Sequence, residues 1–359
     1  MPESELIALI TNFQAKGEYS KATEICEKAL GEGQNYSAGF YFTTAQAFHA
    51  IGRLEDAITS YRLGLAISPD NVPGLINLAK TLKEQGRSLA AARFLQQAGN
   101  IEPNNPEIWY ELANVLQIMG RNEDAINCYQ EVLRLRPEDA AAGHLLAALR
   151  GEDERKVPAE YVRNLFDNYA PRFEQSLVGK LGYDIPAKIG QILRKFDRCY
   201  DRALDLGAGT GLMGGAIKDI AKEISGVDIS ENMVKIARTK NIYKNLECAD
   251  INEFININNN KYDLIIAADV LVYIGELSNL FASIKKIITD NGIFIFSIEL
   301  SASKELELRP HGRYGHSFEY IENLGEKHGL KVLIREETPI RLEEGNPIPG
   351  QIIGLQPKS

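Results

Sequence analysis

The chain has 359 residues, of which 44% are hydrophobic and 25% charged, so it is too long for one ordinary domain and has the composition of a folded, soluble protein. Its net charge of −9 argues against a protein that mainly grips phosphate backbones, and no apolar run approaches the roughly 18 residues of a membrane span. The N-terminus lacks the pattern of a secretory signal. Four scattered cysteines argue against a disulfide framework or a metal site and favour a cytoplasmic location.

The first part of the chain repeats with a period of 34 residues. Four registers share this step: Pro69, Pro103 and Pro137; Gly52, Gly86 and Gly120; Ala57, Ala91 and Ala125; Ala45, Ala79 and Ala113. Two short helices with their turns need about this length. Small residues occur where helices cross closely, and proline ends a helix. We therefore expect helix pairs over residues 4–137 and a closing helix at 140–150, all within a first domain of residues 1–150.

This pattern resembles tetratricopeptide repeats (TPRs). The best-matched unit contains Trp109, Leu112, Ala113, Gly120, Ala125, Tyr129 and Pro137. The resemblance implies a concave surface that docks a protein partner or substrate, or that mediates self-association. The alternative is a scaffold surface with no bound ligand.

Residues 151–159 are predicted to be a linker, because the segment is charged and lacks an apolar rhythm. From residue 160 to 359, short apolar runs alternate with amphipathic helices, which indicates a parallel α/β sheet of Rossmann-like type. The expected strands are 203–206, 223–227, 264–267, 293–298, 331–335 and 351–355, with a further one before Asp250. The expected helices are 212–220, 231–239, 277–288 and 317–328. A loop with Pro339, Pro347 and Pro349 is expected to join the last two strands, which fits an antiparallel end strand.

A glycine-rich turn follows the first expected strand, in the run LDLGAGTGL at 204–212. Doubly wound sheets bind their ligand at this first strand-to-helix crossover. Glycines there let the backbone approach a ligand closely. The turn residues that we expect to contact a ligand are Asp205, Gly207, Ala208, Gly209 and Gly211.

Acidic residues follow the next three expected strands. Asp228 comes 17 residues after Gly211, where a carboxylate can accept hydrogen bonds from both hydroxyls of a ribose. Asp250 can face an adenine amino group, and Asp269 ends the fourth strand. Because parallel strands end at one edge of a sheet, these acids are expected to converge. The alternatives are that Asp205 only holds the turn, that Asp228 or Asp269 starts a helix, and that Asp250 is a turn acid.

The turn departs from the dinucleotide fingerprint, because Leu212 occupies the third small-residue position and a glycine comes one residue early. No Gly-Lys-Ser/Thr follows, which excludes a P-loop. An acid-rich site suits a ligand with a ribose, an amino group and a positive sulfur. S-adenosylmethionine has all three, whereas an NAD-dependent oxidoreductase fits the turn less well.

These residues resemble class I methyltransferases: 204–212 looks like motif I, Asp228 like the ribose acid, and Asp250 and Asp269 like later motifs. The resemblance covers about residues 160–357 and implies a seven-stranded sheet with its last strand antiparallel. It also implies S-adenosylmethionine as cofactor and S-adenosylhomocysteine as product. The remaining implied cofactor residues are Ile229, Met233, Ile251 and Tyr169, with a place in the helix core as the alternative for Met233.

A narrower resemblance rests on three stretches, FDNYAPRFE at 166–174, DVLVYIG at 269–275 and GRYGHS at 312–317. These are similar to bacterial predicted methyltransferases with TPR repeats, which are related to the methyltransferase-like protein of the Williams–Beuren region. The order of closing helix, linker and FDxYA segment is also similar.

Methyl transfer is an in-line displacement that depends mostly on positioning, with a base where the nucleophile carries a proton. The candidate bases are His316, His311 and Tyr273, with His316 ranked above His311 because it lies in a matching stretch. Arg313 and Tyr314 are candidate substrate residues, and Arg313 can pair with an anionic substrate group or with the cofactor carboxylate. The alternatives are an ordinary polar loop and a surface salt bridge.

Absent motifs narrow the reaction. No Asn/Asp-Pro-Pro-Tyr/Phe follows the fourth strand, no cysteine occupies an expected site position, and no basic, aromatic-interleaved patch is present. The sequence therefore predicts an S-adenosylmethionine-dependent enzyme that methylates oxygen or nitrogen of a small molecule or protein side chain, with neither nucleic acid nor membrane as partner. The alternative is a non-catalytic TPR scaffold whose second domain senses the cofactor or its product.

Overall fold

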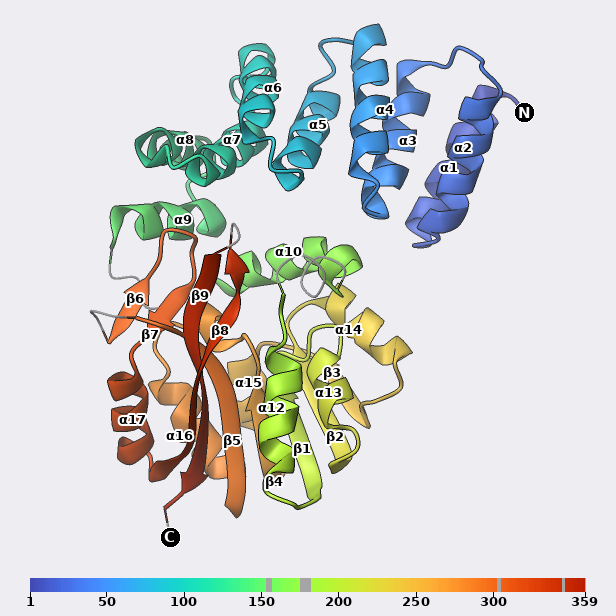
Figure 1. The fold of residues 1–359 in the computed structure, drawn as a ribbon. Coiled ribbons are helices and arrows are strands. Elements are labelled where there is room, and N and C mark those ends of the chain that lie inside the picture. Colours follow the sequence, from blue (N-terminus) through green and yellow to red (C-terminus); the bar gives the residue numbers. More distant parts are fainter. Residues whose placement is uncertain (153–156, 175–181, 302–304, 344–345, 359) are drawn as a thin grey trace. The chain divides into compact units, whose positions relative to one another are not determined.

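The computed structural model describes residues 1–152, 157–174, 182–301, 305–343 and 346–358. The chain divides into two compact units, Met1–Leu146 and Ala147–Ser359 (Figure 1). Part of the expected linker, residues 153–156, lies outside the described residues. No helix among the described residues has the length and apolar character needed to cross a membrane.

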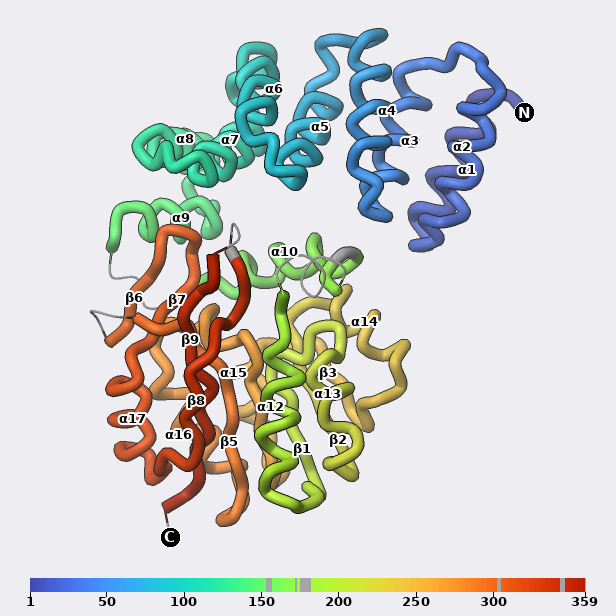
Figure 2. The backbone as a smooth tube through the Cα atoms, in the orientation of Figure 1, coloured from blue at the N-terminus to red at the C-terminus, as the bar shows by residue number. Residues whose placement is uncertain are grey.

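The N-terminal unit consists of helix pairs stacked side by side (Figure 2). The helices are α1 (Glu3–Ala15), α2 (Tyr19–Gly31), α3 (Ala38–Ala50), α4 (Leu54–Ile67), α5 (Val72–Glu84), α6 (Ser88–Ile101), α7 (Pro106–Ile118), α8 (Asn122–Leu135) and α9 (Ala140–Arg150). The expected closing helix is α9, and the division between the units falls within it.

The 34-residue period is confirmed as one helix pair per repeat. The recurring glycines lie between the two helices of a pair and have left-handed φ values of 77°, 76° and 71°, which a side chain would disfavour. The recurring prolines follow the second helix of each pair by two residues. The alanines of both registers are fully buried, as close helix crossings require.

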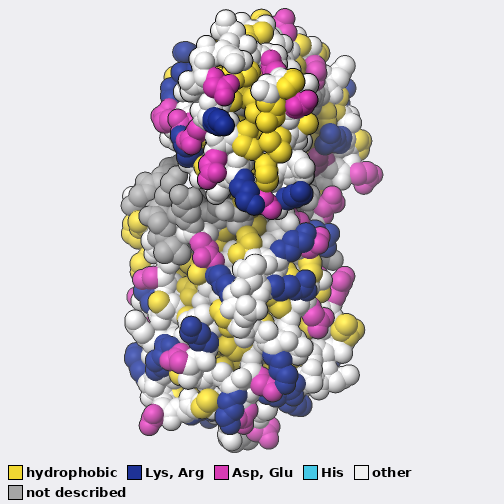
Figure 3. Space-filling model, turned by 90° about the vertical axis from the view of Figure 1, so that its right-hand side faces the viewer, with side chains coloured by type: hydrophobic (Ala, Val, Ile, Leu, Met, Phe, Trp, Pro, Cys, Tyr) yellow, Lys and Arg dark blue, Asp and Glu magenta, His cyan; other side chains and the backbone are white. Residues whose placement is uncertain are grey.

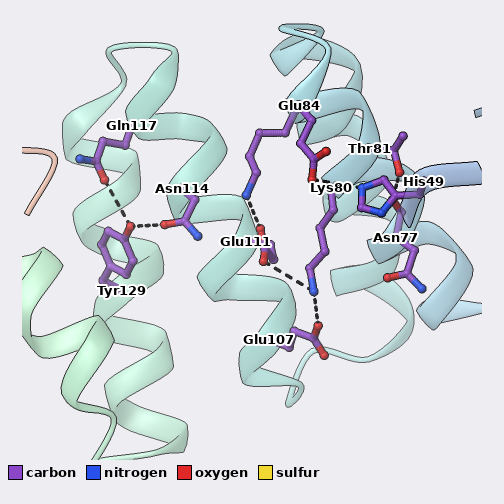
Figure 4. A network of polar contacts seen from close by, with 11 residues as sticks. His49, Asn77, Lys80, Thr81, Glu84, Glu107, Glu111, Asn114, Gln117 and Tyr129 are labelled. Atoms are coloured by element: carbon purple, nitrogen blue, oxygen red, sulfur yellow. Dashed lines mark hydrogen bonds and ion pairs between the residues drawn. The ribbon is translucent and has the colours of Figure 1, made fainter. Parts of the chain in front are cut away.

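Polar side chains connect the first helices of successive pairs (Figure 4). Lys80 on α5 lies between Glu107 and Glu111 on α7, with its Nζ 2.6 and 3.6 Å from their carboxylate oxygens. The Nε2 of His49 on α3 is 3.1 Å from a carboxylate oxygen of Glu84 on α5. These contacts link the second, third and fourth helix pairs in succession. Figure 3 shows that hydrophobic side chains also gather in a strip on the end of this unit formed by α1 and α2.

The C-terminal unit alternates strands and helices. Its strands are β1 (Tyr200–Leu206), β2 (Ala221–Asp228), β3 (Asn245–Cys248), β4 (Tyr262–Ala267), β5 (Ile288–Leu300), β6 (Leu306–Leu308), β7 (Tyr314–His316), β8 (Leu330–Glu343) and β9 (Asn346–Pro357). Its helices are α10 (Ala159–Tyr169), α12 (Ile185–Arg194), α13 (Leu212–Ile217), α14 (Glu231–Thr239), α15 (Ile251–Ile257), α16 (Ser278–Ile287) and α17 (Phe318–Lys327), with short 3-10 turns η1 (Ala170–Arg172) and η2 (Leu271–Tyr273).

The strands form one mixed sheet in the order β3-β2-β1-β4-β5-β7-β6, with β9 antiparallel to both β5 and β8. The expected Rossmann-like fold with an antiparallel late strand is therefore confirmed. The sheet has nine strands in the described part of the chain, rather than seven. The difference arises because the short hairpin β6–β7 joins the sheet beside β5.

The expected proline-containing loop between the last two strands is wrong. β8 and β9 form a long hairpin in which Pro339 pairs with Pro349, and Leu342 with Pro347. Proline cannot donate to a strand ladder and is tolerated where a strand has a free side. β9 pairs with β5 only over Gly350–Leu355, so Pro347 and Pro349 have β8 as their neighbour but not β5.

Apolar side chains cover both faces of the sheet. Along β4, Ile265 and Ala267 belong to one buried cluster, whereas Leu264 and Ile266 belong to the other. Successive strand residues point to opposite faces, so a strand covered on both sides becomes a continuous apolar run. Polar residues therefore occur at the carboxyl ends of these strands rather than along their buried length.

Candidate active site

The glycine turn after β1 has the backbone that its sequence suggests. Gly207, Gly209 and Gly211 all adopt left-handed φ values, of 72°, 53° and 89°. The amides of Gly207 and Ala208 donate to the carbonyl oxygen of Val227 at 2.8 and 3.0 Å. These hydrogen bonds hold the turn against the end of β2, so the turn and Asp228, which follows Val227, lie side by side.

Gly207→Ala is expected to destabilise the C-terminal unit by about 1–3 kcal/mol, because the residue has a positive φ and no room for a side chain. A Cβ there would lie 2.3 Å from Cγ2 of Val270. Hydrogen exchange of β1 and β2 peptides measures the effect. Gly215→Ala, where a Cβ would meet only Ile242 Cδ1 at 3.8 Å, is the control. Equal protection in the two variants would contradict the steric explanation.

Asp228 ends β2 directly beside this turn. Its Oδ2 accepts from the amide of Gly209 and its Oδ1 from the amide of Ser230, each at 2.8 Å. The side chain is nearly buried, and this burial raises its pKa. A carboxylate offers about four acceptor positions, so Asp228 can accept from further donors such as ribose hydroxyls.

Helix α10, in the FDxYA segment, docks beside Asp228. The Oγ of Ser230 donates to Oδ1 of Asp167 at 2.6 Å, and the amide of Asn232 donates to the same oxygen at 3.1 Å. Ser230 also accepts from the amide of Met233 and so caps α14. Asp167 was not a candidate site residue from sequence, although it lies in a stretch that the narrower resemblance includes. Residues 175–181, beyond this segment, lie outside the described part of the chain.

Asp205 lies within β1 and is almost fully buried. Its Oδ2 accepts a hydrogen bond from the hydroxyl of Tyr243 at 2.6 Å. Tyr243 comes from the segment between α14 and β3, and sequence reasoning missed it. No local signal connects a tyrosine at that position with an acid 38 residues earlier.

Asp250 and Asp269 occupy different environments. Oδ1 of Asp250 accepts from the amides of Asn252 and Glu253 at 2.8 and 3.2 Å, as expected for an acid that starts α15. Asp269 has a left-handed φ of 57° at the end of β4, and its amide donates to Oγ of Ser297. Its carboxylate lies 3.7 Å from Arg341, so Asp269 faces the β5 side of the sheet edge rather than Asp228.

A buried ion cluster lies at the carboxyl end of β5. Glu299 is fully buried, with its oxygens 2.7 Å from Nη1 of Arg309, 2.6 Å from Nη2 of Arg341 and 3.9 Å from Nη1 of Arg313. Burial opposes its ionisation, but Arg341 and Arg313 outweigh this effect, so its pKa lies below the usual value. Glu299 and Arg341 were not predicted, because their contacts join residues distant in sequence.

The candidate residues Arg313 and Tyr273 lie close to each other. The guanidinium of Arg313 is 5.4 Å from the ring centre of Tyr273, and the Phe166 ring of α10 contacts the same ring edge-on at 5.2 Å. The side chain of Arg313 is only 26% exposed, so a simple surface salt bridge does not describe it. Burial raises the pKa of Tyr273, which makes its hydroxyl a weak acid and keeps it protonated near neutral pH.

The two candidate histidines differ in position. His316 in β7 is fully buried, its Nε2 is 3.1 Å from the carbonyl oxygen of Gly275, and burial lowers its pKa to about 4. This environment favours a structural role for the ring. His311 lies on the turn between β6 and β7 and is half-buried, next to Arg313 on the same hairpin. Tyr314 is fully buried in β7.

The remaining predicted cofactor residues lie around the same sheet edge. Met233 is fully buried in α14, in agreement with a place in the helix core. Ile229 and Ile251 are half-buried after β2 and at the start of α15. Tyr169, at the end of α10, is half-buried, with its ring edge-on to Phe173 at 5.6 Å.

Comparison with known families agrees with this arrangement. A family model described as a methyltransferase domain matches residues 204–296, and models of the tetratricopeptide repeat match residues 38–71 and 82–149. The chain carries a methyltransferase domain and tetratricopeptide repeats. Both assignments agree with the resemblances found in the sequence, whereas the narrower Williams–Beuren comparison remains a prediction.

Individual relatives match parts of the chain. Protein NPG1 of Arabidopsis thaliana is 31% identical over 121 residues, or 32% of this chain and 17% of that protein. The human mitochondrial import receptor subunit TOM70 is 22% identical over 204 residues, or 54% of this chain and 33% of that protein. The chain thus spans about one sixth of the first of these relatives and a third of the second.

Among solved structures, the chain is similar to magnesium protoporphyrin IX methyltransferase (ChlM) from Synechocystis PCC 6803 with bound S-adenosylhomocysteine. The two are 18% identical, and the match covers 56% of this chain and 99% of that one, with a TM-score of 0.45.

The methyltransferase match supports S-adenosylmethionine as the cofactor, and the site geometry is compatible with it. Asp228 lies beside the glycine turn and can accept from further donors, and Asp205 has a buried Oδ1 with no hydrogen-bond partner among the described residues. Acidic groups at the ends of β1 and β2 suit the positive charges of this cofactor.

Proposed function

We propose that the chain is an S-adenosylmethionine-dependent methyltransferase that modifies oxygen or nitrogen of a small molecule or protein side chain. The observation that carries this proposal is the position of Asp228, whose carboxylate is hydrogen-bonded to the glycine turn and can accept from further donors. The match of residues 204–296 to a methyltransferase domain supports it.

Different residues along the sheet edge would bind different parts of the cofactor. Asp228 would accept the two ribose hydroxyls, the turn at 207–211 would let the backbone approach the ligand, and Asp250 would face the adenine through its second oxygen. When bound, the cofactor supplies an electrophilic methyl group on a positively charged sulfur. The carboxylates at the ends of β1 and β2 favour a cation there.

The acceptor is proposed to lie on the β4–β5 side of the edge, next to Tyr273 and Arg313. The charge of Arg313 is permanent, so it suits an anionic group of the acceptor. Of the two histidines, the proposal keeps His311 as base for an acceptor that carries a proton. His316 is buried and bonded to Gly275, which supports a role in holding η2 and the following loop in place.

The TPR unit is proposed to dock a protein partner, the substrate or a second copy of the chain. The tetratricopeptide matches support this role. The polar contacts between α3, α5 and α7 include acidic side chains and Lys80, which provide charges of both signs on the first helices of the repeats. A cytoplasmic location is part of the proposal and is supported by four unpaired cysteines.

Calorimetric titration with S-adenosylmethionine, S-adenosylhomocysteine and NAD tests the cofactor. We expect micromolar binding of the first two and none of NAD, because the acid-rich edge suits a cation rather than a pyrophosphate. Binding of NAD alone would contradict the proposal. Transfer of a labelled methyl group to an acceptor then separates the enzyme from the alternative, a scaffold that binds the cofactor without turnover.

A further inference from the structure

The ring of Tyr243 fills a space that three glycines leave beneath the cofactor turn. A Cβ on Gly214 would lie 2.6 Å from the Tyr243 hydroxyl, and one on Gly226 would lie 2.9 Å from its Cε1. A Cβ on Gly211 would lie 3.2 Å from its Cε2. These glycines belong to α13, to β2 and to the turn itself, so a single side chain packs against three elements of the crossover.

The same side chain makes a hydrogen bond with a buried acid. The hydroxyl of Tyr243 donates to Oδ2 of Asp205 at 2.6 Å, and Asp205 is only 1% exposed. Asp205 precedes Gly207 by two residues, so the hydrogen bond acts at the point where β1 becomes the turn. A tyrosine is required for this combination, because a smaller polar residue would leave the glycine-lined space empty.

Opposing effects set the pKa of Asp205, which is raised to about 7. Burial raises this pKa, the hydrogen bond from Tyr243 lowers it, and the charge of Asp228 on β2 raises it. Among the described residues, Tyr183 also interacts with Asp205; it precedes α12, and burial raises its own pKa. Loss of the Tyr243 hydroxyl would therefore raise the pKa of Asp205 further and favour its neutral form.

We propose that Tyr243 is a positioning residue of the cofactor site, which orders the glycine turn and keeps Asp205 ionised beneath it so that binding of the cationic cofactor depends on this carboxylate. The proposal rests on the proposed function, because it assumes that the turn holds S-adenosylmethionine. Tyr243 acts through Asp205 and the turn and does not itself contact the ligand.

This arrangement links cofactor binding to a proton. Below pH 7, Asp205 carries a proton, and a ligand with a positive ammonium group binds more strongly when that proton leaves. Affinity for S-adenosylhomocysteine should therefore rise as the pH increases through about 7. Binding near that pH should release part of a proton to the buffer.

The experiment is calorimetric titration of the full chain with S-adenosylhomocysteine between pH 5.5 and 8.5, in buffers of different ionisation enthalpy. For Tyr243→Phe we expect the midpoint of the affinity profile and the pH of maximal proton release to move up by about one pH unit or more. At pH 7.5 this corresponds to an affinity lower by about threefold to tenfold. A residue with a merely structural role would lower affinity without moving this profile.

Two variants make the result decisive. Tyr262→Phe removes another buried hydroxyl, which accepts from Asn258 Nδ2 at 3.0 Å, and should leave the profile unchanged. Asp205→Asn keeps the shape of the side chain but has no proton to release, so it should abolish the release near pH 7 even if Tyr243→Phe folds poorly. An unchanged profile in Tyr243→Phe, or persistent proton release in Asp205→Asn, would overturn the inference. Failure of the wild-type chain to bind S-adenosylhomocysteine would instead refute the proposed function on which it rests.

Discussion

Glu299→Ala is expected to destabilise the methyltransferase domain by about 3–5 kcal/mol. Glu299 is fully buried at the end of β5, with carboxylate oxygens within 2.7 Å of Arg309 and Arg341. Removal of one member of a buried ion pair leaves the other charge in a medium of low dielectric constant without its counter-ion. Because Arg341 belongs to β8 and Arg309 precedes β7, the loss should loosen both hairpins beside β5.

The measurement must follow the second domain by itself. The chain has a single tryptophan, Trp109, in helix α7 of the repeat unit, so its fluorescence reports the wrong domain. Hydrogen exchange of β5 and β9 peptides reports the domain directly, with peptides of α5 and α6 as an internal reference. Glu336→Ala is the matched control: Glu336 is 45% exposed, and its pair with Lys195 should contribute at most about 1 kcal/mol. Similar exchange in the two variants would show that the cluster contributes little.

The effect of Glu299 also has a predictable pH dependence. Its pKa is lowered in the folded state, since Arg341 and Arg313 outweigh the effect of burial. A carboxylate with a lowered pKa stabilises the fold fully at pH values above its unfolded-state pKa of about 4.5. This contribution is lost as the pH falls through its folded-state pKa. The difference between the wild type and Glu299→Gln should therefore shrink as the pH falls below about 4.5.

The repeat unit could be predicted almost completely because its determinants are local. A glycine between two helices and an alanine at their crossing act within one 34-residue unit, and the same requirements return in the next unit. The left-handed φ of Gly86 and the complete burial of Ala91 follow directly from those requirements. The polar contacts between repeats, such as that between Lys80 and Glu111, depend on how neighbouring units stack, and the period alone does not specify them.

In the methyltransferase domain, the glycine turn and the strands other than β6 and β7 were predicted because each has its own local pattern. Helix α14 occupies the expected residues 231–239, since Ser230 caps its first turn. The hairpin β6–β7 was missed because its three-residue strands are too short to give an alternating pattern. The prolines of β8 and β9 were assigned to a loop because proline usually breaks a strand, whereas here these positions have a neighbouring strand on one side only.

The parts of the site that escaped prediction depend on contacts between distant residues. Asp205 and Asp228 were identified from their positions after strands, but the partners that set their charge come from other segments. Tyr243 reaches Asp205 across 38 residues, and Asp167 reaches Ser230 across 63. Periodicity and motif spacing indicate where a strand ends. They do not indicate which side chain from a distant part of the sequence packs against that strand end.

Asp228→Ala is expected to weaken binding of S-adenosylhomocysteine by about 1.5–3 kcal/mol, or roughly tenfold to a hundredfold, because charge-assisted hydrogen bonds to the ribose would be lost. The same carboxylate accepts from the amides of Gly209 and Ser230, so a loss of affinity alone would also follow from a disordered turn. The titration therefore also needs a ligand that lacks the ribose hydroxyl proposed to contact Asp228.

A 2′-deoxyribose analogue of S-adenosylhomocysteine removes a hydroxyl that Asp228 is proposed to bind. The wild type should bind this analogue more weakly than the parent, whereas Asp228→Ala should bind the two alike, because it lacks the carboxylate that contacts the hydroxyl. If the variant still discriminates between the two ligands as strongly as the wild type does, Asp228 holds the turn and does not bind the ribose. Ser230→Ala is the control for that structural role. It removes the cap of α14 and the bond to Asp167 but leaves the carboxylate in place, so it should reduce stability by about 1 kcal/mol and preserve the discrimination.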